Sequence, residues 1–382
     1  MFNRNLLDTI DSLENQYLDI LEDVCDIESP TSLKEGVDRT VDYIIKIAKA
    51  HGWQTEIFYQ SVAGNAGCIT MNPNATKAPI CLSGHLDTVH PVGSFGYPAV
   101  RRDEKNMYGP GVMDCKGGVV AALMAMDALQ RCGFSDRPVK LILQSDEETS
   151  SITSQKSTIE YMCRRAEGAV AFLNLEGHVR GTAVLTRKGI IRYRFTVTGR
   201  ALHAARCFNA ANAITEAAHK IIRLERMKDA YGLTCNCGVI NGGTVPNTVA
   251  EKCTFIADIR FADNEQLMAA KEEVGLTAEE CHVDGCSCQV EELSFRPAMP
   301  LTAKNEELLA RINEIYAEYG IPPLSARSCL SGSDAAYITE AGIPCIDCIG
   351  TLGGNIHSTN EYMELGSLAA SAKMIATIAH DI

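Results

Sequence analysis

The chain has 382 residues, 46% of them hydrophobic and 22% charged, and its formal net charge at pH 7 is −13. This length exceeds one typical domain core and predicts two or three domains. The negative charge argues against nucleic acid and anionic membrane surfaces as partners, because both would repel the protein at long range. We also expect neither a signal peptide in the acidic amino-terminal segment nor a membrane span, because no apolar stretch is long enough.

Sixteen cysteines are scattered through apolar segments, which indicates reduced thiols in a cytoplasmic protein. The CIDC stretch, Cys345 to Cys348, is an alternative candidate for a metal or redox site. Its flanks have the pattern of a β-strand core, where cysteine is a common small hydrophobe, so the structural interpretation is favoured.

The first half of the chain has the pattern of a layered α/β domain. Apolar residues at helical spacing predict an opening helix that ends before residues 29–31, and a second helix covers about 38–51. A strand-rich region then runs to APICLSGHLDTV, VVAALMAMDALQR predicts a buried helix, and PVKLILQSDEE and GAVAFLNLEG are apolar runs that end in acidic residues. Continuous apolar strands separated by helices indicate a doubly wound, mostly parallel sheet, with its ligand site beyond the carboxyl ends of the strands.

From about residue 182 the pattern changes to alternation. Strands are expected at GIIRYRFTVTG, GLTCNCGVING, EKCTFIADIRF and SCQVEELSF, with helices over 208–225 and NEQLMAAKEEVGL. Their order is the ferredoxin-like β-α-β-β-α-β pattern, and after Pro297 the α/β pattern resumes. We therefore predict a catalytic domain made of residues 1–181 and 297–382, interrupted by an inserted domain over 182–296.

Ionisable residues stand at several predicted strand ends of the catalytic sheet. They are His85 with Asp87 in SGHLDTV, Asp114, the pair Glu147 and Glu148, Glu176, and His357. Each has an ordinary explanation when taken singly, such as an N-cap for Asp114 or a solvated loop for the glutamate pair. Their convergence on one sheet edge favours a catalytic site for zinc or a related divalent ion.

Two local arrangements make this chemistry specific. Adjacent residues at a strand end point in different directions, so one glutamate of the pair can bind metal while the other holds a water molecule. Asp114 has two oxygens on a short side chain and suits a bridge between two cations roughly 3.5–4 Å apart.

The motifs SGHLDTV, YGPGVMDCKGG, SDEETSS, NLEG, GRALHAA, VPNTVAEKC and IHSTNEY give the chain a family resemblance. In order and approximate spacing they resemble the dinuclear zinc peptidase and deacylase family. That family includes glutamate carboxypeptidase, acetylornithine deacetylase, succinyl-diaminopimelate desuccinylase and aminoacylase. The resemblance covers essentially the whole chain and is greatest to the glutamate carboxypeptidase branch.

The resemblance implies two Zn²⁺ per subunit, with Co²⁺ or Mn²⁺ as alternatives. It implies that His85 and Glu176 hold one ion, that Glu148 and His357 hold the other, and that Asp114 bridges them. Glu147 would be the general base and Asp87 the carboxylate behind His85. The family has a cis peptide after the bridging aspartate, here Asp114–Cys115, and commonly an aspartate or small polar residue where this chain has Cys115.

The resemblance also assigns roles in the inserted domain, which would act as a lid and join two chains in a homodimer. His203 would reach the substrate carbonyl, often in the partner subunit, while Asn247 and Arg296 would meet the substrate carboxylate. Without the resemblance, the last two are a turn asparagine and a surface arginine.

The implied activity is a zinc-dependent hydrolase that cleaves the amide bond of a small peptide or N-acyl amino acid and releases an amino acid with a free carboxylate. One alternative is an N-acyl-amino-acid deacylase of the acetylornithine deacetylase or succinyl-diaminopimelate desuccinylase type. Another is an inactive relative that binds amino acid derivatives or metal.

Overall fold

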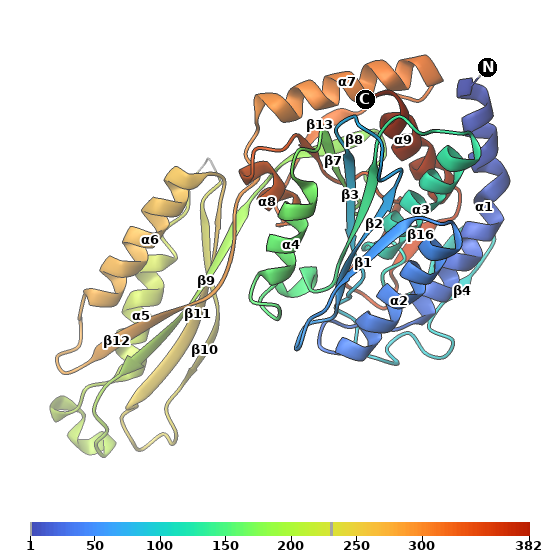
Figure 1. Ribbon diagram of the computed structural model, residues 1–382. Coiled ribbons are helices and arrows are strands. Elements are labelled where there is room, and N and C mark those ends of the chain that lie inside the picture. Colours follow the sequence, from blue (N-terminus) through green and yellow to red (C-terminus); the bar gives the residue numbers. More distant parts are fainter. Residues whose placement is uncertain (1, 230–231) are drawn as a thin grey trace. The chain divides into compact units, whose positions relative to one another are not determined.

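The protein forms two compact units in a computed structural model that describes residues 2–229 and 232–382 (Figure 1). The larger unit contains Met1–Leu185, Leu301–Ser328 and Ser333–Ile382, and the smaller unit contains Thr186–Pro300 with Cys329–Gly332. The smaller unit thus begins at Thr186, whereas 182 was expected, because Val184 forms a β-bridge with Asp347 of the larger unit.

The larger unit is built on a six-stranded mixed sheet. In sheet order its strands are β1 (Gln54–Phe58), β2 (Ala66–Met71), β6 (Val139–Gln144), β3 (Ile80–His85), β7 (Ala171–Asn174) and β14 (Cys345–Ile346). The four strands from β6 to β14 run parallel, while β1 and β2 form an antiparallel edge. Strand β3 is buried along its whole length and lies between β6 and β7, so its carboxyl end lies near the middle of the sheet edge.

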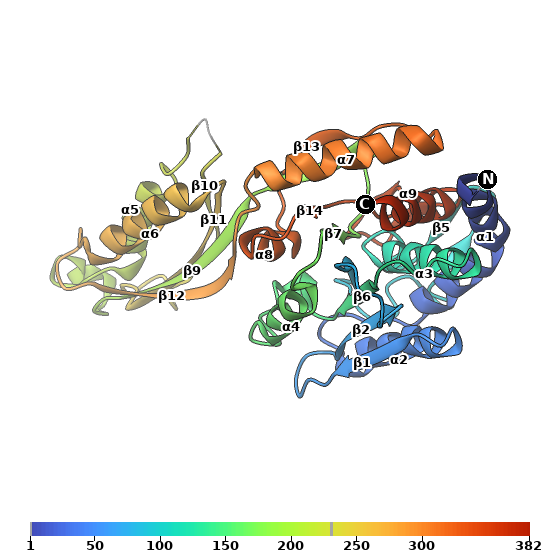
Figure 2. The same cartoon turned by 45° about the horizontal axis from the view of Figure 1, so that its top comes forward.

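Helices cover both faces of this sheet. They are α1 (Phe2–Asp26), α2 (Lys34–Ala50), α3 (Lys116–Arg131), α4 (Ser157–Ala166), α7 (Ala303–Tyr319), α8 (Ala335–Glu340) and α9 (Ser367–Asp381). Helices α1, α3 and α9 pack together on one side, while α4 and α8 lie on the other (Figures 1 and 2). The nearly all-apolar α3 is buried along almost its entire length, as its sequence predicts. This is the predicted doubly wound, mostly parallel architecture.

Short strands bring distant loops together beside the main sheet. A four-stranded sheet contains β15 (Gly353–Gly354), β16 (Tyr362–Glu364), β5 (Asn106–Tyr108) and β4 (Arg101–Arg102), and β8 (Thr182–Arg187) pairs with β13 (Ser325–Cys329). The pairing of β16 with β5 sets the loop around His357 beside the segment that leads to Asp114.

The smaller unit is a four-stranded antiparallel sheet with two helices packed on one face. In chain order its main elements are β9 (Gly189–Thr198), α5 (Ala213–Leu224), β10 (Thr234–Gly242), β11 (Lys252–Phe261), α6 (Asn264–Glu279) and β12 (Ser287–Arg296). The sheet order is β10-β11-β9-β12, and a ladder of apolar side chains such as Phe195 and Phe255 faces the helices. The predicted β-α-β-β-α-β order is therefore present.

The helix expected over 208–225 begins later, at Ala213. The side chain of Asn212 accepts hydrogen bonds from the amides of Ile214 and Thr215 and so caps the helix. The preceding residues form a separate 3₁₀ helix, Ala204–Asn209.

All 16 cysteines lie in the described part of the chain and are free thiols. Cys345 and Cys348 are both buried, in agreement with their interpretation as core residues. Within residues 2–229 and 232–382, no helix is both long and apolar enough to cross a membrane.

Candidate active site

The end of β3 places His85 and Asp87 together inside the larger unit. Both side chains are buried, and Leu86 between them turns into the apolar core. His85 Nδ1 lies 2.9 Å from the backbone oxygen of Asp87 and 3.5 Å from its carboxylate. Donation from Nδ1 to these oxygens leaves Nε2 as the nitrogen that faces the neighbouring carboxylates, which is the arrangement a metal-binding histidine requires.

Asp87 also organises the loop that follows β6. Its two carboxylate oxygens accept hydrogen bonds from the backbone amides of Glu147 and Glu148, each at 3.2 Å, and Oδ2 accepts another from the Thr31 hydroxyl at 2.6 Å. Burial opposes ionisation of Asp87, yet its contacts with His85, Thr31 and Glu148 lower its pKa. One anionic side chain therefore fixes both the histidine and the glutamate pair.

Asp114 lies between two histidines. Its Oδ1 is 3.1 Å from Nε2 of His85, and its Oδ2 is 3.2 Å from Nε2 of His357. Burial alone would raise the pKa of Asp114, but the hydrogen bonds from His357 and His85 hold it far below its usual range. The N-cap of α3 is Cys115 and has no side-chain capping bond, so the N-cap explanation for Asp114 is wrong. The expected non-proline cis peptide, Asp114–Cys115, is present.

Glu148 and Glu176 flank this aspartate. Glu148 Oε2 lies 3.3 Å from Nε2 of His357, and Glu176 Oε1 lies 3.7 Å from Nε2 of His85. Burial raises the pKa of Glu148 to about 7. Hydrogen bonds to Asp114 and Glu148 raise the pKa of His357 to about 10. Because both Glu147 and Glu148 are largely shielded, the solvated-loop interpretation of this pair is wrong.

The donor set fits divalent metal. Two groups have ligand atoms that all lie within 4.8 Å of one another, namely His85 with Asp114 and Glu148, and His85 with Cys115 and Glu176. Three carboxylates face only two histidines, which leaves a surplus of negative charge. Burial lowers the pKa of His85, but its contacts with Cys115, Asp114 and Asp87 raise it well above its usual value. A divalent cation would offset the same surplus, and a set of imidazole and carboxylate donors suits zinc and related ions.

Two further residues support the site without appearing among the predicted ones. Glu361 is buried, and its Oε1 accepts hydrogen bonds from the backbone amides of Met113 at 3.0 Å and Asp114 at 3.1 Å. Its Oε2 lies 3.0 Å from Nε2 of His90. Glu361 therefore holds the backbone that carries Asp114. Only its position in the IHSTNEY motif marked it in the sequence.

Asp146 holds the loop that contains Glu147 and Glu148, as Glu361 holds the backbone of Asp114. Its carboxylate accepts hydrogen bonds from the amide of Ser154 at 2.9 Å and from the hydroxyl of Thr158 at 2.8 Å. These bonds tie the loop after the 3₁₀ turn Glu147–Thr149 to helix α4. Its place directly before the glutamate pair is the signal that could have identified it.

The remaining predicted residues lie in the smaller unit. His203 and Asn247 are exposed and occupy facing segments, joined by the hydrogen bond from the Ala204 amide to the Asn247 carbonyl at 2.9 Å. Arg296 ends β12 and is 4% exposed, so its interpretation as a surface arginine is wrong. The larger unit thus brings together His85, Asp87, Asp114, Glu148, Glu176 and His357, with Glu147 on the same loop as Glu148.

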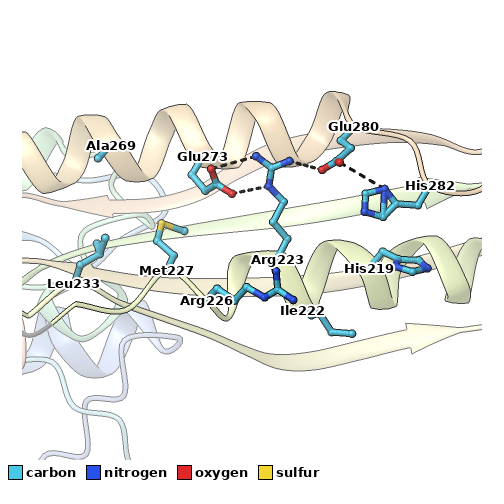
Figure 3. A pocket seen from close by; sticks show the side chains of 10 residues that line it. All are labelled: His219, Ile222, Arg223, Arg226, Met227, Leu233, Ala269, Glu273, Glu280 and His282. Atoms are coloured by element: carbon cyan, nitrogen blue, oxygen red, sulfur yellow. Dashed lines mark hydrogen bonds and ion pairs between the residues drawn. The ribbon is translucent and has the colours of Figure 1, made fainter.

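A cavity of about 660 Å³ lies elsewhere, between α5 and α6 of the smaller unit (Figure 3). Arg223 spans it and pairs with Glu273 and Glu280, while His219 and His282 stand at one end. None of the predicted site residues lines it. Its charged side chains largely neutralise one another.

A carboxylate between two histidines, ringed by further carboxylates at a sheet edge, is a set of donors that can hold divalent metal. The chain belongs to peptidase family M20/M25/M40, whose model matches residues 81–381. This confirms the resemblance that the motifs gave, and the chain is a hydrolase of that family.

Curated relatives include both peptidases and deacylases. Carboxypeptidase G2 of Pseudomonas sp. (strain RS-16) is 26% identical over 374 residues, which cover 95% of this chain and 88% of the relative. Acetylornithine deacetylase of Myxococcus xanthus is 28% identical over 242 residues, 58% of this chain and 60% of the relative. Among solved structures, a tripeptidase from Staphylococcus aureus has a TM-score of 0.80 at 22% identity and covers 96% of this chain and 98% of its own. The structural likeness establishes the fold.

Proposed function

We propose that the protein is a metal-dependent amidohydrolase of the glutamate carboxypeptidase type. It would cleave the bond on the amino side of an amino acid that carries a free carboxylate. The observation that carries this proposal is the Asp114 carboxylate, whose two oxygens each face a different histidine, with the glutamate pair held beside it by Asp87. A deacylase acting on N-acetyl or N-succinyl amino acids is the second candidate, favoured by the similarity to acetylornithine deacetylase.

Five side chains would hold two divalent ions, with Zn²⁺ as the proposed metal. His85 and Glu176 would hold one ion, Glu148 and His357 would hold the other, and Asp114 would be shared between them. The chemistry supplied when the ions are bound is polarisation of the scissile carbonyl and activation of a water molecule.

Glu147 acts as the general base and acid. Its amide is anchored by Asp87, and it belongs to neither group of residues that could hold a metal, whereas Glu148 does. The Glu147 carboxylate takes a proton from the attacking water and later delivers it to the leaving amine nitrogen. A group committed only to metal binding could not perform this transfer.

His203 has the protonation pattern of a hydrogen-bond donor to a carbonyl oxygen. Its Nδ1 accepts a hydrogen bond from the amide of Ala205 at 3.2 Å. In the neutral ring the proton then resides on Nε2, which is left to donate. We assign it to the developing negative charge on the substrate carbonyl oxygen.

Arg296 and Asn247 are proposed to bind the substrate carboxylate. A guanidinium offers two parallel donors that match a carboxylate, and the asparagine amide adds another. This contact would favour substrates with a free carboxylate, and that preference distinguishes a carboxypeptidase-type reaction from the hydrolysis of amides in general.

A homodimer through the smaller unit completes the proposal. Strand β10 stands at one edge of the order β10-β11-β9-β12. Val239 and Ile240 on this strand and Ile214 on α5 are exposed apolar side chains. A second copy would cover them and extend the sheet at its open edge.

The deciding experiment is a hydrolysis screen on protein treated with a chelator and then given Zn²⁺, Co²⁺ or Mn²⁺. Substrates are dipeptides that end in glutamate or in another amino acid, each as a free acid and as the carboxyl amide, together with N-acetyl and N-succinyl amino acids. Activity should return with metal and favour the free acids. Full activity in the metal-free protein would overturn the proposal, and preference for N-acetyl or N-succinyl substrates would select the deacylase.

Arg296→Ala tests the carboxylate contact in the same assay. It should lower kcat/KM for free acids by about 10- to 100-fold, because a charge-assisted hydrogen bond contributes roughly 1.5–3 kcal/mol. Arg296→Lys should recover part of this, and amidated substrates should change little. Arg194→Ala is the matched control, since Arg194 lies in the same sheet but pairs with Glu291. Equal losses on both substrates would mean that Arg296 does not contact the carboxylate.

A further inference from the structure

The sulfur of Cys115 contacts the backbone of His85, one of the proposed metal ligands. Cys115 is 0% exposed and follows Asp114 directly at the start of α3. Its Sγ accepts a hydrogen bond from the backbone amide of His85 at 3.0 Å and lies 3.6 Å from the carbonyl oxygen of the same residue. The thiol is therefore fixed against the backbone of a proposed metal ligand.

The sulfur also lies within the donor cluster. The ligand atoms of His85, Cys115 and Glu176 are all within 4.8 Å of one another. His85 and Glu176 are the two residues proposed to hold the same metal ion. A third donor of a different chemical kind therefore stands beside that pair, on the residue next to Asp114.

We propose that Cys115 is a sulfur ligand of the metal ion held by His85 and Glu176. This rests on the proposed metal site and adds a donor to it. In the binding step the S–H proton leaves to solvent and a sulfur–metal bond replaces the S–H bond. The His85 amide would then donate its hydrogen bond to the bound thiolate.

A sulfur donor has consequences for metal choice. Thiolate favours zinc, cobalt and cadmium over magnesium and manganese, which prefer oxygen donors. The two positions of the site therefore differ, since the Glu148–His357 side offers carboxylate and imidazole alone among the described residues around it. We expect the ion beside Cys115 to be the one that resists chelation longer.

The test is X-ray absorption spectroscopy of the zinc-loaded protein. Zinc–sulfur bonds are roughly 2.3 Å long, whereas zinc bonds to histidine and carboxylate are roughly 2.0–2.2 Å, so one sulfur per site produces a separate shell. The cobalt-substituted protein should show a near-ultraviolet sulfur-to-cobalt charge-transfer band. Both signals should disappear in Cys115→Ser, and its zinc Kd should rise by at least about tenfold.

Cys81→Ser is the matched control. Cys81 is a buried thiol on β3, close to His85 in sequence, but its sulfur points toward the carbonyl oxygen of Arg165. This variant should keep both the sulfur shell and the cobalt band. Circular dichroism of Cys115→Ser and Cys115→Ala establishes that the fold persists. If neither variant folds, a zinc spectrum of the unmodified protein without a sulfur shell still overturns the proposal.

Three outcomes separate this inference from the proposed function. A sulfur shell that depends on Cys115 supports it. Zinc coordinated by nitrogen and oxygen alone, in a protein that hydrolyses its substrates, overturns the sulfur ligand and leaves the function intact, with Cys115 as a residue that only positions the His85 backbone. Failure to bind zinc at all overturns both.

Discussion

Glu147 and Glu148 are neighbours with different environments, so we expect different effects when each is replaced by glutamine. Glu148 faces His357, while the backbone amide of Glu147 donates a hydrogen bond to the carboxylate of Asp87 and is held beside the cluster. Glu147→Gln should lower kcat by a factor of about 10²–10⁴ and leave metal content nearly unchanged. Glu148→Gln should lower metal content, as measured by elemental analysis after dialysis. If the first variant loses metal and the second does not, the two roles are reversed.

The second prediction for a single residue concerns Glu361. Its carboxylate accepts two backbone hydrogen bonds and faces His90, whereas a glutamine has a single acceptor oxygen and must turn its amide group toward one side. Glu361→Gln should weaken metal binding by about 10- to 100-fold, because the backbone of Asp114 is no longer held. Competition with a fluorescent zinc chelator measures this. Glu364→Gln, three residues further on, serves as the control, since that residue pairs with exposed Arg180. Unchanged zinc affinity in Glu361→Gln would contradict the positioning role.

Some of the candidate ligands could be predicted from the sequence because they follow an apolar run whose end must lie at the sheet edge. His85 and Glu176 are clear examples. Glu361, Thr31 and Cys115 could not be, because they act on the backbone or side chains of residues distant in the chain. Nothing local distinguishes Thr31 from any turn threonine until Asp87 is seen to accept its hydroxyl.

At the scale of elements, long periodic segments were predictable and short ones were not. Strand β3 and helix α3 have apolar patterns that allow one conformation each. Strands such as β4, β14 and β15 contain two residues, too few for any periodicity, and exist only because a neighbouring strand pairs with them. The start of α5 was placed too early because the apolar pattern begins before Asn212, the residue that caps the helix.

A buried lysine fixes the two helices of the smaller unit. Lys220 on α5 is buried, and its Nζ donates to the carbonyl of Thr277 at 2.7 Å, near the end of α6, and pairs with Glu216 at 3.0 Å. Lys220→Met would leave the carbonyl groups and Glu216 without their cation. We expect the smaller unit to lose about 3–5 kcal/mol of stability, since breaking a buried pair strands a charge.

Hydrogen exchange of amides in the smaller unit is the appropriate measurement for Lys220→Met. The only tryptophan, Trp53, belongs to the larger unit, so its fluorescence should change little. Lys228→Met is the control, because the Lys228–Glu225 pair is exposed and should contribute nothing measurable. Unaltered exchange in Lys220→Met would show that the buried contact is dispensable.

At the scale of the whole molecule, the two units carry different parts of the proposed reaction. The proposed metal ligands and Glu147 belong to the larger unit, and His203 belongs to the smaller one. If the homodimer forms through the smaller unit, His203 can serve the cluster of its own chain or that of its partner. A mixture of two inactive variants distinguishes these arrangements.

His203→Ala and Glu147→Gln should each be nearly inactive alone, because one lacks the donor to the carbonyl and the other lacks the base. In a heterodimer with shared sites, the first chain supplies an intact Glu147 and the second an intact His203, so one complete site forms. Co-expression with two affinity tags isolates this heterodimer, and light scattering confirms its size. Restored activity, at about half that of the unmodified dimer if the two sites are independent, is the expected result. In a dimer whose sites use their own His203, neither site of the heterodimer is complete. An inactive heterodimer of confirmed composition, or a fully active monomer, would therefore contradict shared sites without affecting the metal chemistry.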